Sequence, residues 1–167
     1  RTRPVTSSSG IGDPKYAKSN RSKEPQEEYL LVDGYNIIFA WDELNALAKD
    51  SLEAARHKLM DILCNYAGYR KCVPILVFDA YRVKGAGREQ ETWHNLHVIY
   101  TREAETADMF IERATHELAK NHRVRVVSSD GAEQIIILGN GALRVSARAF
   151  EREVRAVEAE IREFLDQ

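Results

Sequence analysis

The sequence predicts an α/β fold in which a mostly parallel central sheet is flanked by helices in three layers. Four short, continuous apolar segments are typical of strands that are buried on both faces of a sheet. Segments whose apolar residues recur at helical spacing lie between them. Strands that alternate with helices form βαβ units, and such units build parallel sheets.

The first half of the chain supplies two strands and a long helix. Residues 29–32 form an apolar run that ends in an aspartate. Residues 51–69 follow a helical spacing, with Asp50 or Ser51 as the N-cap. Residues 73–78 form the second apolar run. The helix residues expected to face the core are Leu52, Ala55, Leu59, Ile62, Leu63 and Tyr66.

A loop, two further strands and a second helix follow. Residues 82–95 are polar and contain glycine, which predicts a loop. A short strand is expected at 97–100 and a fourth at 124–127. Between them a helix runs from its cap at Thr106 to about Asn121.

The last part of the domain is predicted to be mostly helical. Residues 132–138 favour a helix, and Gly139 and Gly141 frame a turn. A long helix follows Ser146. Its apolar seam consists of Phe150, Val154, Val157, Ile161 and Leu165.

Residues 1–28 are predicted to be a flexible linker or tail, and residues 29–167 a single domain. The first segment holds three of the four prolines, a Ser-Ser-Ser-Gly run and almost no large apolar side chains, so it cannot bury enough surface to fold. Its net charge is +2, against −4 for the remainder. Because the chain begins without Met, we expect it to be a piece of a longer polypeptide.

Composition excludes several classes of protein. No apolar run approaches the roughly 18 residues that a membrane span needs, and the N-terminus lacks the apolar stretch of a secretory signal. Cys64 and Cys72 make neither a disulfide framework nor a paired zinc spacing, so we expect buried free thiols. These observations favour the reducing cytoplasm.

Three of the predicted strands are followed by an aspartate, namely Asp33, Asp79 and Asp130. The carboxyl ends of parallel strands meet at one end of a sheet, where ligands bind. Any one of these residues could simply be a turn former or a helix N-cap. Three together would repel one another unless a cation or a proton intervened.

A further acidic group lies at the start of the helix that Thr106 caps. Asp108 and Glu112 lie together off its apolar stripe, and Glu105 directly precedes the cap. Acids in a first turn also stabilise the helix dipole, which is the structural alternative. Oxygen ligands of this kind suit Mg²⁺ or Mn²⁺. The pattern therefore favours metal-assisted hydrolysis of a phosphodiester.

These residues resemble the motifs of the YacP-like branch of NYN domains, which are PIN-like nucleases. The similar segments are LVDGYNII (31–38), VFDA (77–80), TREAETAD (101–108) and VSSD (127–130). They occur in the expected order over about residues 29–165. The resemblance implies a PIN-like fold, dependence on Mg²⁺ or Mn²⁺, and endonucleolytic cleavage of single-stranded RNA.

The resemblance also implies roles for individual residues. Asp33, Asp108 and Asp130 match the acidic metal-site positions, and Asp79 matches the acid of the second strand. Glu105 is a candidate fifth ligand. The remaining catalytic candidate is the side-chain amide of Asn36. It could orient Asp33, hold a water on the metal or simply belong to a strand-to-helix turn.

YacP-like proteins are linked to cleavage of mRNA at the ribosome, and similar domains are fused behind translational GTPases. The resemblance therefore implies mRNA, the ribosome and a translational GTPase as partners. For contact with RNA, cations can meet phosphates and aromatic faces can stack on unpaired bases. The candidates are Arg82, Lys84, Arg88, Trp93 and Arg102.

Two other functions compete with the nuclease. The first is a catalytically silent RNA- or ribosome-binding module that keeps the fold. The second is an α/β phosphohydrolase that acts on small phosphoesters. Against the second, the sequence holds neither an Asp-x-Asp-x-Thr nucleophile motif nor a phosphate-cradling Gly-x-x-x-x-Gly-Lys loop.

Overall fold

The computed structural model describes residues 27–79, 89–128 and 141–167. Within these residues a six-stranded sheet has the order β3-β4-β2-β1-β5-β6. Five strands are parallel, and only β3 runs antiparallel to its neighbour β4. The predicted mostly parallel sheet is therefore confirmed. The strands are β1 (Glu28–Asp33), β2 (Val73–Phe78), β3 (Glu89–Trp93), β4 (Leu96–Tyr100), β5 (Arg123–Ser128) and β6 (Leu143–Ser146).

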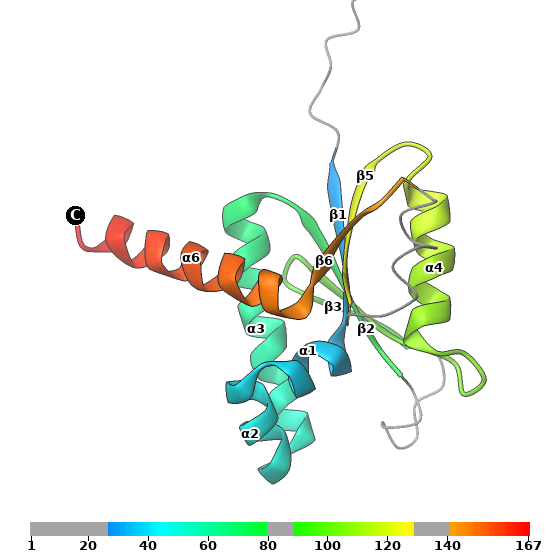
Figure 1. The fold of residues 1–167 in the computed structure, drawn as a ribbon, viewed down its shortest axis with the longest axis horizontal. Helices are drawn as coiled ribbons and strands as arrows, with labels where there is room; N and C mark the ends of the chain where they lie inside the picture. The colour runs from blue at the N-terminus through cyan, green and yellow to red at the C-terminus, as the bar shows by residue number, and fades with distance from the viewer. Residues whose placement is uncertain (1–26, 80–88, 129–140) are drawn as a thin grey trace, which may run out of the picture.

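Helices cover both faces of this sheet (Figure 1). On one side lie α1, α3 and α6, with α2 packed against α1 and α3, and on the other side lies α4. None of the helices in the described part of the chain is both long and apolar enough to cross a bilayer. Their bounds are α1 (Gly34–Ala40), α2 (Asp42–Asp50), α3 (Leu52–Arg70), α4 (Ala107–Leu118) and α6 (Ala147–Leu165).

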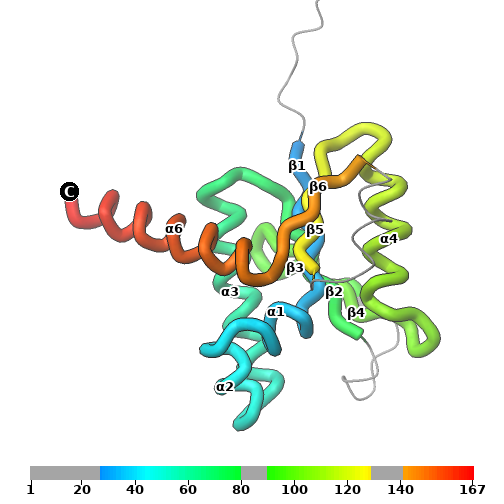
Figure 2. The backbone as a smooth tube through the Cα atoms, viewed as in Figure 1, coloured from blue at the N-terminus to red at the C-terminus, as the bar shows by residue number. Residues whose placement is uncertain are grey.

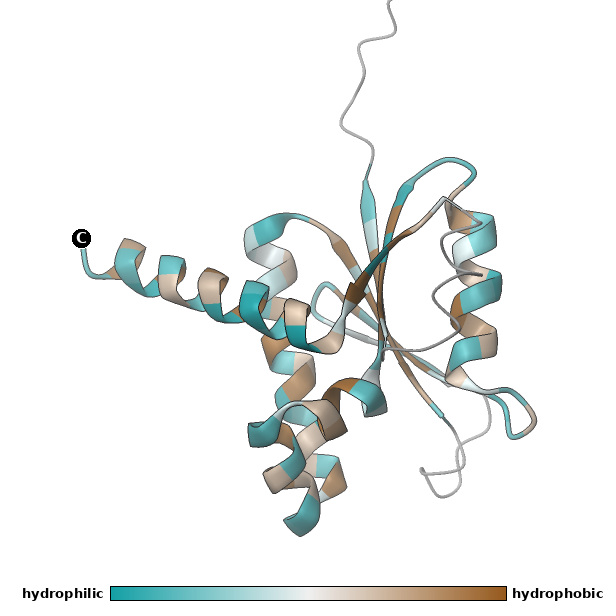
Figure 3. Ribbon diagram, viewed as in Figure 1, coloured by the Kyte–Doolittle hydropathy of each residue, from teal (hydrophilic) through white to brown (hydrophobic). Residues whose placement is uncertain are grey.

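The sheet separates two hydrophobic core clusters, and the brown strands of Figure 3 run between them. Successive side chains of a strand point to opposite faces, so each central strand contributes to both clusters. The first cluster joins the sheet to α1, α2, α3 and α6. The second cluster lies beneath α4 and contains Leu31, Val77, Ala107, Phe110, Ile111, Val124, Val126 and Ala142.

The predicted N-caps of α3 and α4 are confirmed. The Ser51 hydroxyl accepts from the Ala54 N–H at 3.1 Å, and the Thr106 hydroxyl accepts from the Met109 N–H at 3.2 Å. Each cap satisfies one of the N–H groups that a helix start leaves without a partner. The starts of α3 and α4 are therefore fixed by local chemistry that the sequence displays.

Two edge strands were not predicted. The loop expected over 82–95 is wrong for Glu89–Trp93, which forms β3, and β6 was not anticipated at all. Both strands lie at an edge of the sheet, and their described side chains are exposed or only partly buried, so they carry no apolar pattern. The helix expected at 132–138 lies outside the described residues, as does Gly139.

Three smaller predictions differ from the structure. The strand β1 begins at Glu28, the last residue of the predicted tail. Leu165 was placed on the apolar seam of α6 but is 71% exposed, because this end of α6 projects beyond the sheet (Figures 1 and 2). Cys64 and Cys72 are free thiols, as predicted, but only half-buried. Burial still raises the pKa of Cys72 to about 11.

Candidate active site

A row of polar residues lies at the carboxyl end of the sheet, on the face that α4 covers. Asp33 ends β1, Asp79 directly follows β2, and Ser128 ends β5. The residues two positions before them, Leu31, Val77 and Val126, belong to the second core cluster. Because side chains two positions apart along a strand point to the same face, these polar residues point toward α4. Asp33 and Ser128 are level in the sheet, because Val32 of β1 pairs with Val127 of β5.

Asp33 is held in place by the helix that it starts. Its carboxylate caps α1, accepting from the Asn36 backbone N–H at 3.4 Å and from the Asn36 side-chain Nδ2 at 2.7 Å. A Cβ at Gly34 would overlap the ring of Phe78, so this position needs glycine for the chain to turn from β1 into α1. These two hydrogen bonds are those expected of a residue that orients Asp33, one of the alternatives for Asn36.

Asp79 connects the sheet to the start of α4. Its Oδ1 atom accepts from the backbone N–H of Ala107 at 2.7 Å. This bond fastens the first residue of α4 to the end of β2. Because Asp108 comes next, it lies in the first turn of a helix that starts at the carboxyl end of the sheet. The structure therefore brings Asp33, Asp79 and Asp108 together, and we call these three residues the carboxylate cluster.

The carboxylate cluster shares one electrostatic field. Asp33 is only 5% exposed, and its burial, followed by the charges of Asp108 and then Asp79, raises its pKa to about 7. The hydrogen bonds from Asn36 act in the opposite direction but do not compensate. A buried carboxylate surrounded by like charges is the electrostatic environment that a cation would relieve.

The donor set fits Mg²⁺ or Mn²⁺ in its chemistry, because all of its atoms are carboxylate oxygens. Among residues 27–79, 89–128 and 141–167, however, no group of three histidine, cysteine, aspartate or glutamate side chains is assembled closely enough to hold a metal ion. The predicted ligand Asp130 lies outside the described residues. The fit therefore rests on charge and on oxygen donors rather than on a preformed coordination shell.

The structure gives Glu105 a different partner. Its carboxylate forms an ion pair with Arg113 at 2.6 Å, and only 11% of its side chain is exposed. Arg113 lies in the second turn of α4, the helix whose cap Glu105 precedes. The charge of Glu105 is therefore already compensated by a neighbouring cation.

The predicted RNA-contacting residues do not form one group. Arg102 is exposed and lies just beyond the carboxyl end of β4, which is the same end of the sheet as the carboxylate cluster. Trp93 lies at the opposite end, because β3 runs antiparallel and pairs Trp93 with the first residue of β4, Leu96. The structure therefore does not bring Trp93 to the carboxylates. The remaining candidates, Arg82, Lys84 and Arg88, lie outside the described residues.

Two polar groups at this end of the sheet were not predicted. Thr101 is fully buried directly after β4, and its N–H donates to the Phe78 carbonyl at 3.0 Å. Arg144 of β6 donates from Nε to the Ser128 hydroxyl at 3.2 Å. Arg144 could not be identified from the sequence because β6 itself was not recognised. The only available signal was the basic residue in a short apolar segment.

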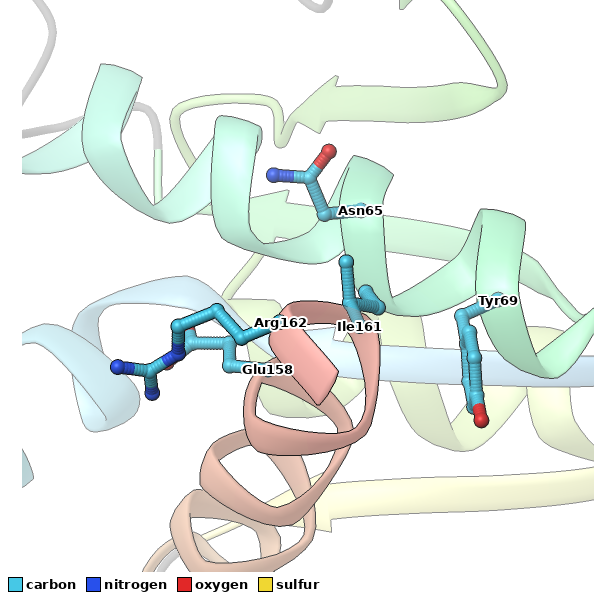
Figure 4. A pocket seen from close by; sticks show the side chains of 5 residues that line it. All are labelled: Asn65, Tyr69, Glu158, Ile161 and Arg162. Carbon is cyan, nitrogen blue, oxygen red and sulfur yellow. The ribbon is translucent and has the colours of Figure 1, made fainter. Parts of the chain in front are cut away.

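A separate pocket of about 640 Å³ lies between α3 and α6 (Figure 4). Asn65 and Tyr69 come from the half of α3 that leads to the start of β2, so the pocket faces away from the carboxyl end of the sheet. None of its lining residues belongs to the carboxylate cluster. We therefore assign the candidate site by its chemistry rather than by this hollow.

Comparisons with known proteins agree with this architecture. A family model described as YacP-like NYN domain matches residues 30–167. The chain is 44% identical over 135 residues to an uncharacterized protein YacP of Bacillus subtilis, covering 80% of this chain and 79% of that protein. A crystal structure of Rae1 (YacP) from Bacillus subtilis matches with a TM-score of 0.72 and 42% identity, over 83% of this chain and 79% of that one. A mutant of the same protein gives a TM-score of 0.71 and 41% identity, over 81% and 80% of the two chains.

Proposed function

Because this chain belongs to the YacP-like NYN domain family, whose fold is that of PIN-like nucleases, we propose that it is a metal-dependent endoribonuclease that cleaves single-stranded RNA. The observation that carries the proposal is the buried Asp33 carboxylate, whose pKa is raised by burial and by Asp108 and Asp79. Such repulsion destabilises the folded protein, and strongly raised carboxylate pKa values of this kind cluster at functional sites, which supports the proposal.

Within this proposal each residue has a defined task. Asp33, Asp108 and Asp130 would hold Mg²⁺ or Mn²⁺, with Asp79 and Glu105 as further ligand candidates. When bound, such an ion supplies positive charge to the attacked phosphate and activates the attacking water. Asn36 fixes the orientation of Asp33 through its 2.7 Å hydrogen bond.

The substrate and its setting are proposed from the family. We place the activity in the cytoplasm, on mRNA during translation, with the ribosome and a translational GTPase as partners. Arg102 is suited to contact a phosphate of the RNA, because it is an exposed cation at the carboxyl end of β4. Arg82, Lys84 and Arg88 remain predicted contacts of the same kind.

A cleavage assay tests the proposal. Single-stranded RNA is incubated with the protein in Mg²⁺, in Mn²⁺ or in EDTA, and the products are separated by length. We expect internal cuts only with metal, and at least about 100-fold slower cleavage by Asp33→Asn and Asp108→Asn, because each removes a charge from the cluster. Asp61→Asn, an exposed aspartate of α3, is the matched control. Undiminished cleavage by Asp33→Asn would refute the site.

A catalytically silent RNA- or ribosome-binding module is the second candidate. It is favoured by one observation, that no three potential metal ligands of the described residues are already grouped. Under this alternative the protein binds single-stranded RNA, and neither metal nor the Asp33→Asn substitution changes the length of the RNA. The same assay, followed by a binding measurement, decides between the two functions.

A further inference from the structure

Two exposed arginines, Arg148 and Arg152, lie at the start of α6, and we call them the arginine pair. They are four positions apart, so their side chains are neighbours on one face of the helix. In the parts of the chain that the structure describes, neither side chain forms an ion pair or a hydrogen bond, and Glu151 is not paired with either of them. Both cations are therefore accessible to an anion from solution.

The arginine pair does not stabilise the fold in the way that other arginines of this helix do. Positive charges near the start of a helix oppose its dipole, and like charges four residues apart repel each other. The first turn of α6 contains no acidic residue that would offset Arg148. By contrast, Arg155 forms ion pairs with Glu43 at 2.8 Å and with Glu158 at 3.0 Å. Two unpaired cations side by side are suited to contact phosphates.

The sheet brings the start of α6 level with the carboxylate cluster. Strand β6 ends at Ser146, which pairs with Ser128 at the end of β5. Strand β5 in turn pairs with β1, which ends at Asp33. Neighbouring strands are about 4.8 Å apart, so the ends of β1 and β6 are separated by roughly 10 Å. Helices α1, α4 and α6 all begin at this end of the sheet (Figure 1). The arginine pair and the carboxylate cluster therefore lie at the same end.

A further cation lies on the other side of the carboxylate cluster. Arg102 follows the end of β4, is exposed and has no ion pair within the described ranges of the chain. The strand order β4-β2-β1-β5-β6 fixes the order of the groups along the carboxyl end of the sheet. In this order they are Arg102, Asp79, Asp33 and then the arginine pair. Cations thus flank the carboxylates on both sides.

We propose that the arginine pair binds the phosphate backbone of a single-stranded RNA that crosses the carboxyl end of the sheet, from Arg102 over the carboxylate cluster to α6. This proposal rests on the proposed function and gives its substrate a path. Cationic side chains contact the phosphates of every nucleotide, so they add affinity without selecting a sequence. The arginine pair thus holds the RNA on one side of the phosphate that is cleaved.

The test is the salt dependence of RNA binding in EDTA, so that the RNA stays intact. A short, fluorescently labelled single-stranded RNA is titrated with each variant at several NaCl concentrations, and its anisotropy is recorded. We expect Arg148→Gln/Arg152→Gln to bind more weakly, with a slope of log affinity against log salt that is shallower by about 1.4, the equivalent of two phosphate contacts to a single strand. Arg148→Lys/Arg152→Lys keeps both charges and should keep the slope of the parent.

A matched control and a folding measurement accompany this test. Arg70→Gln/Arg162→Gln removes two exposed arginines from the last turns of α3 and α6, and it should leave the slope unchanged. The melting temperature of Arg148→Gln/Arg152→Gln should equal or exceed that of the parent, because positive charge is removed from a helix start. Weaker binding by this variant would then be due to the lost contacts and not to unfolding.

Cleavage tests whether the arginine pair lies on the path to the carboxylate cluster. In Mn²⁺, with the RNA far below saturation, cleavage by Arg148→Gln/Arg152→Gln should slow by the same factor as its affinity falls. Weaker binding with undiminished cleavage would refute the path. An unchanged slope in this variant, or an equal change in the control, would refute the arginine pair while the nuclease proposal stands. If the parent binds RNA but does not cleave it, the nuclease proposal fails and the binding surface stands. If the parent does not bind single-stranded RNA, both are refuted.

Discussion

Burial of the Asp33 carboxylate destabilises the folded protein at neutral pH. Its pKa is raised from the ordinary value of 3.8 to about 7, first by burial, then by Asp108 and, more weakly, by Asp79. A group whose pKa is higher in the folded state binds its proton more tightly there than in the unfolded chain. Stability due to this group is therefore greatest below about pH 4 and falls as the pH rises toward 7.

Replacing Asp33 by asparagine should remove this pH dependence. The introduced amide has no proton to lose, yet its carbonyl oxygen can still accept from the Asn36 amide. Relative to the parent in EDTA, Asp33→Asn should gain stability between pH 4.5 and pH 8, by at most about 4 kcal/mol, the equivalent of the pKa difference. Urea unfolding at both pH values measures it, with Asp61→Asn as control. Parallel pH profiles for the parent and Asp33→Asn would contradict the assigned burial.

Individual site residues could be predicted from the sequence when their position depends on a strand end. Asp33 and Asp79 come directly at or after parallel strands, so the rule for carboxyl ends places them together. Trp93 could not be placed in this way. It was assigned to a loop near Asp79, whereas an antiparallel strand carries it to the other end of the sheet. Whether a strand runs parallel or antiparallel to its neighbour depends on how the sheet is paired, and a polar segment of sequence does not indicate it.

At the scale of elements, α4 depends on a residue outside its own sequence. Its cap, Thr106, accepts from Met109, while Asp79 accepts from the N–H of Ala107. Asp79 therefore acts as a second N-cap of α4, and it also anchors this helix to the end of β2. This capping role would account for an aspartate at position 79 without any metal. Capping and metal binding therefore need separate tests.

Two substitutions at Asp79 separate these roles. Asp79→Asn keeps an oxygen that can accept from Ala107, whereas Asp79→Ala removes it. We expect amide hydrogen exchange in the first turn of α4 to accelerate about fivefold in Asp79→Ala, the equivalent of about 1 kcal/mol for a lost cap, and little in Asp79→Asn. The last turn of α4 serves as the internal control. Equal acceleration in both variants would mean that charge, not the hydrogen bond, holds the helix.

Three of the elements that the sequence did not reveal, β3, β6 and α1, lack a recognisable apolar pattern. Strands β3 and β6 lie at the two edges of the sheet, and their described side chains are exposed or only partly buried, so they show no apolar alternation. The helix α1 is short, and its apolar residues leave no polar stripe that would mark a helical period. By contrast α3, with its cap and long apolar stripe, was predicted nearly to the residue.

At the scale of the whole molecule, the carboxylate cluster exists only in the folded chain. Asp33, Asp79 and Asp108 come from β1, the end of β2 and the start of α4, and the parallel sheet assembles them. Unfolding separates these residues, because they are far apart along the chain. An ion that binds among them therefore binds the folded state and adds its binding free energy to stability.

Manganese should consequently raise the melting temperature of the parent protein. At 100 times the dissociation constant, one bound ion adds about 2.7 kcal/mol. For a domain of this size, that corresponds to a rise of roughly 5–10 °C. The increase should be lost in Asp33→Asn/Asp108→Asn, because both substitutions remove charge from the cluster, and kept in Asp61→Asn. Thermal unfolding at increasing Mn²⁺, with EDTA as the baseline, measures the shift. An equal rise in the double variant would mean that the ion binds elsewhere and that the raised pKa of Asp33 has another purpose.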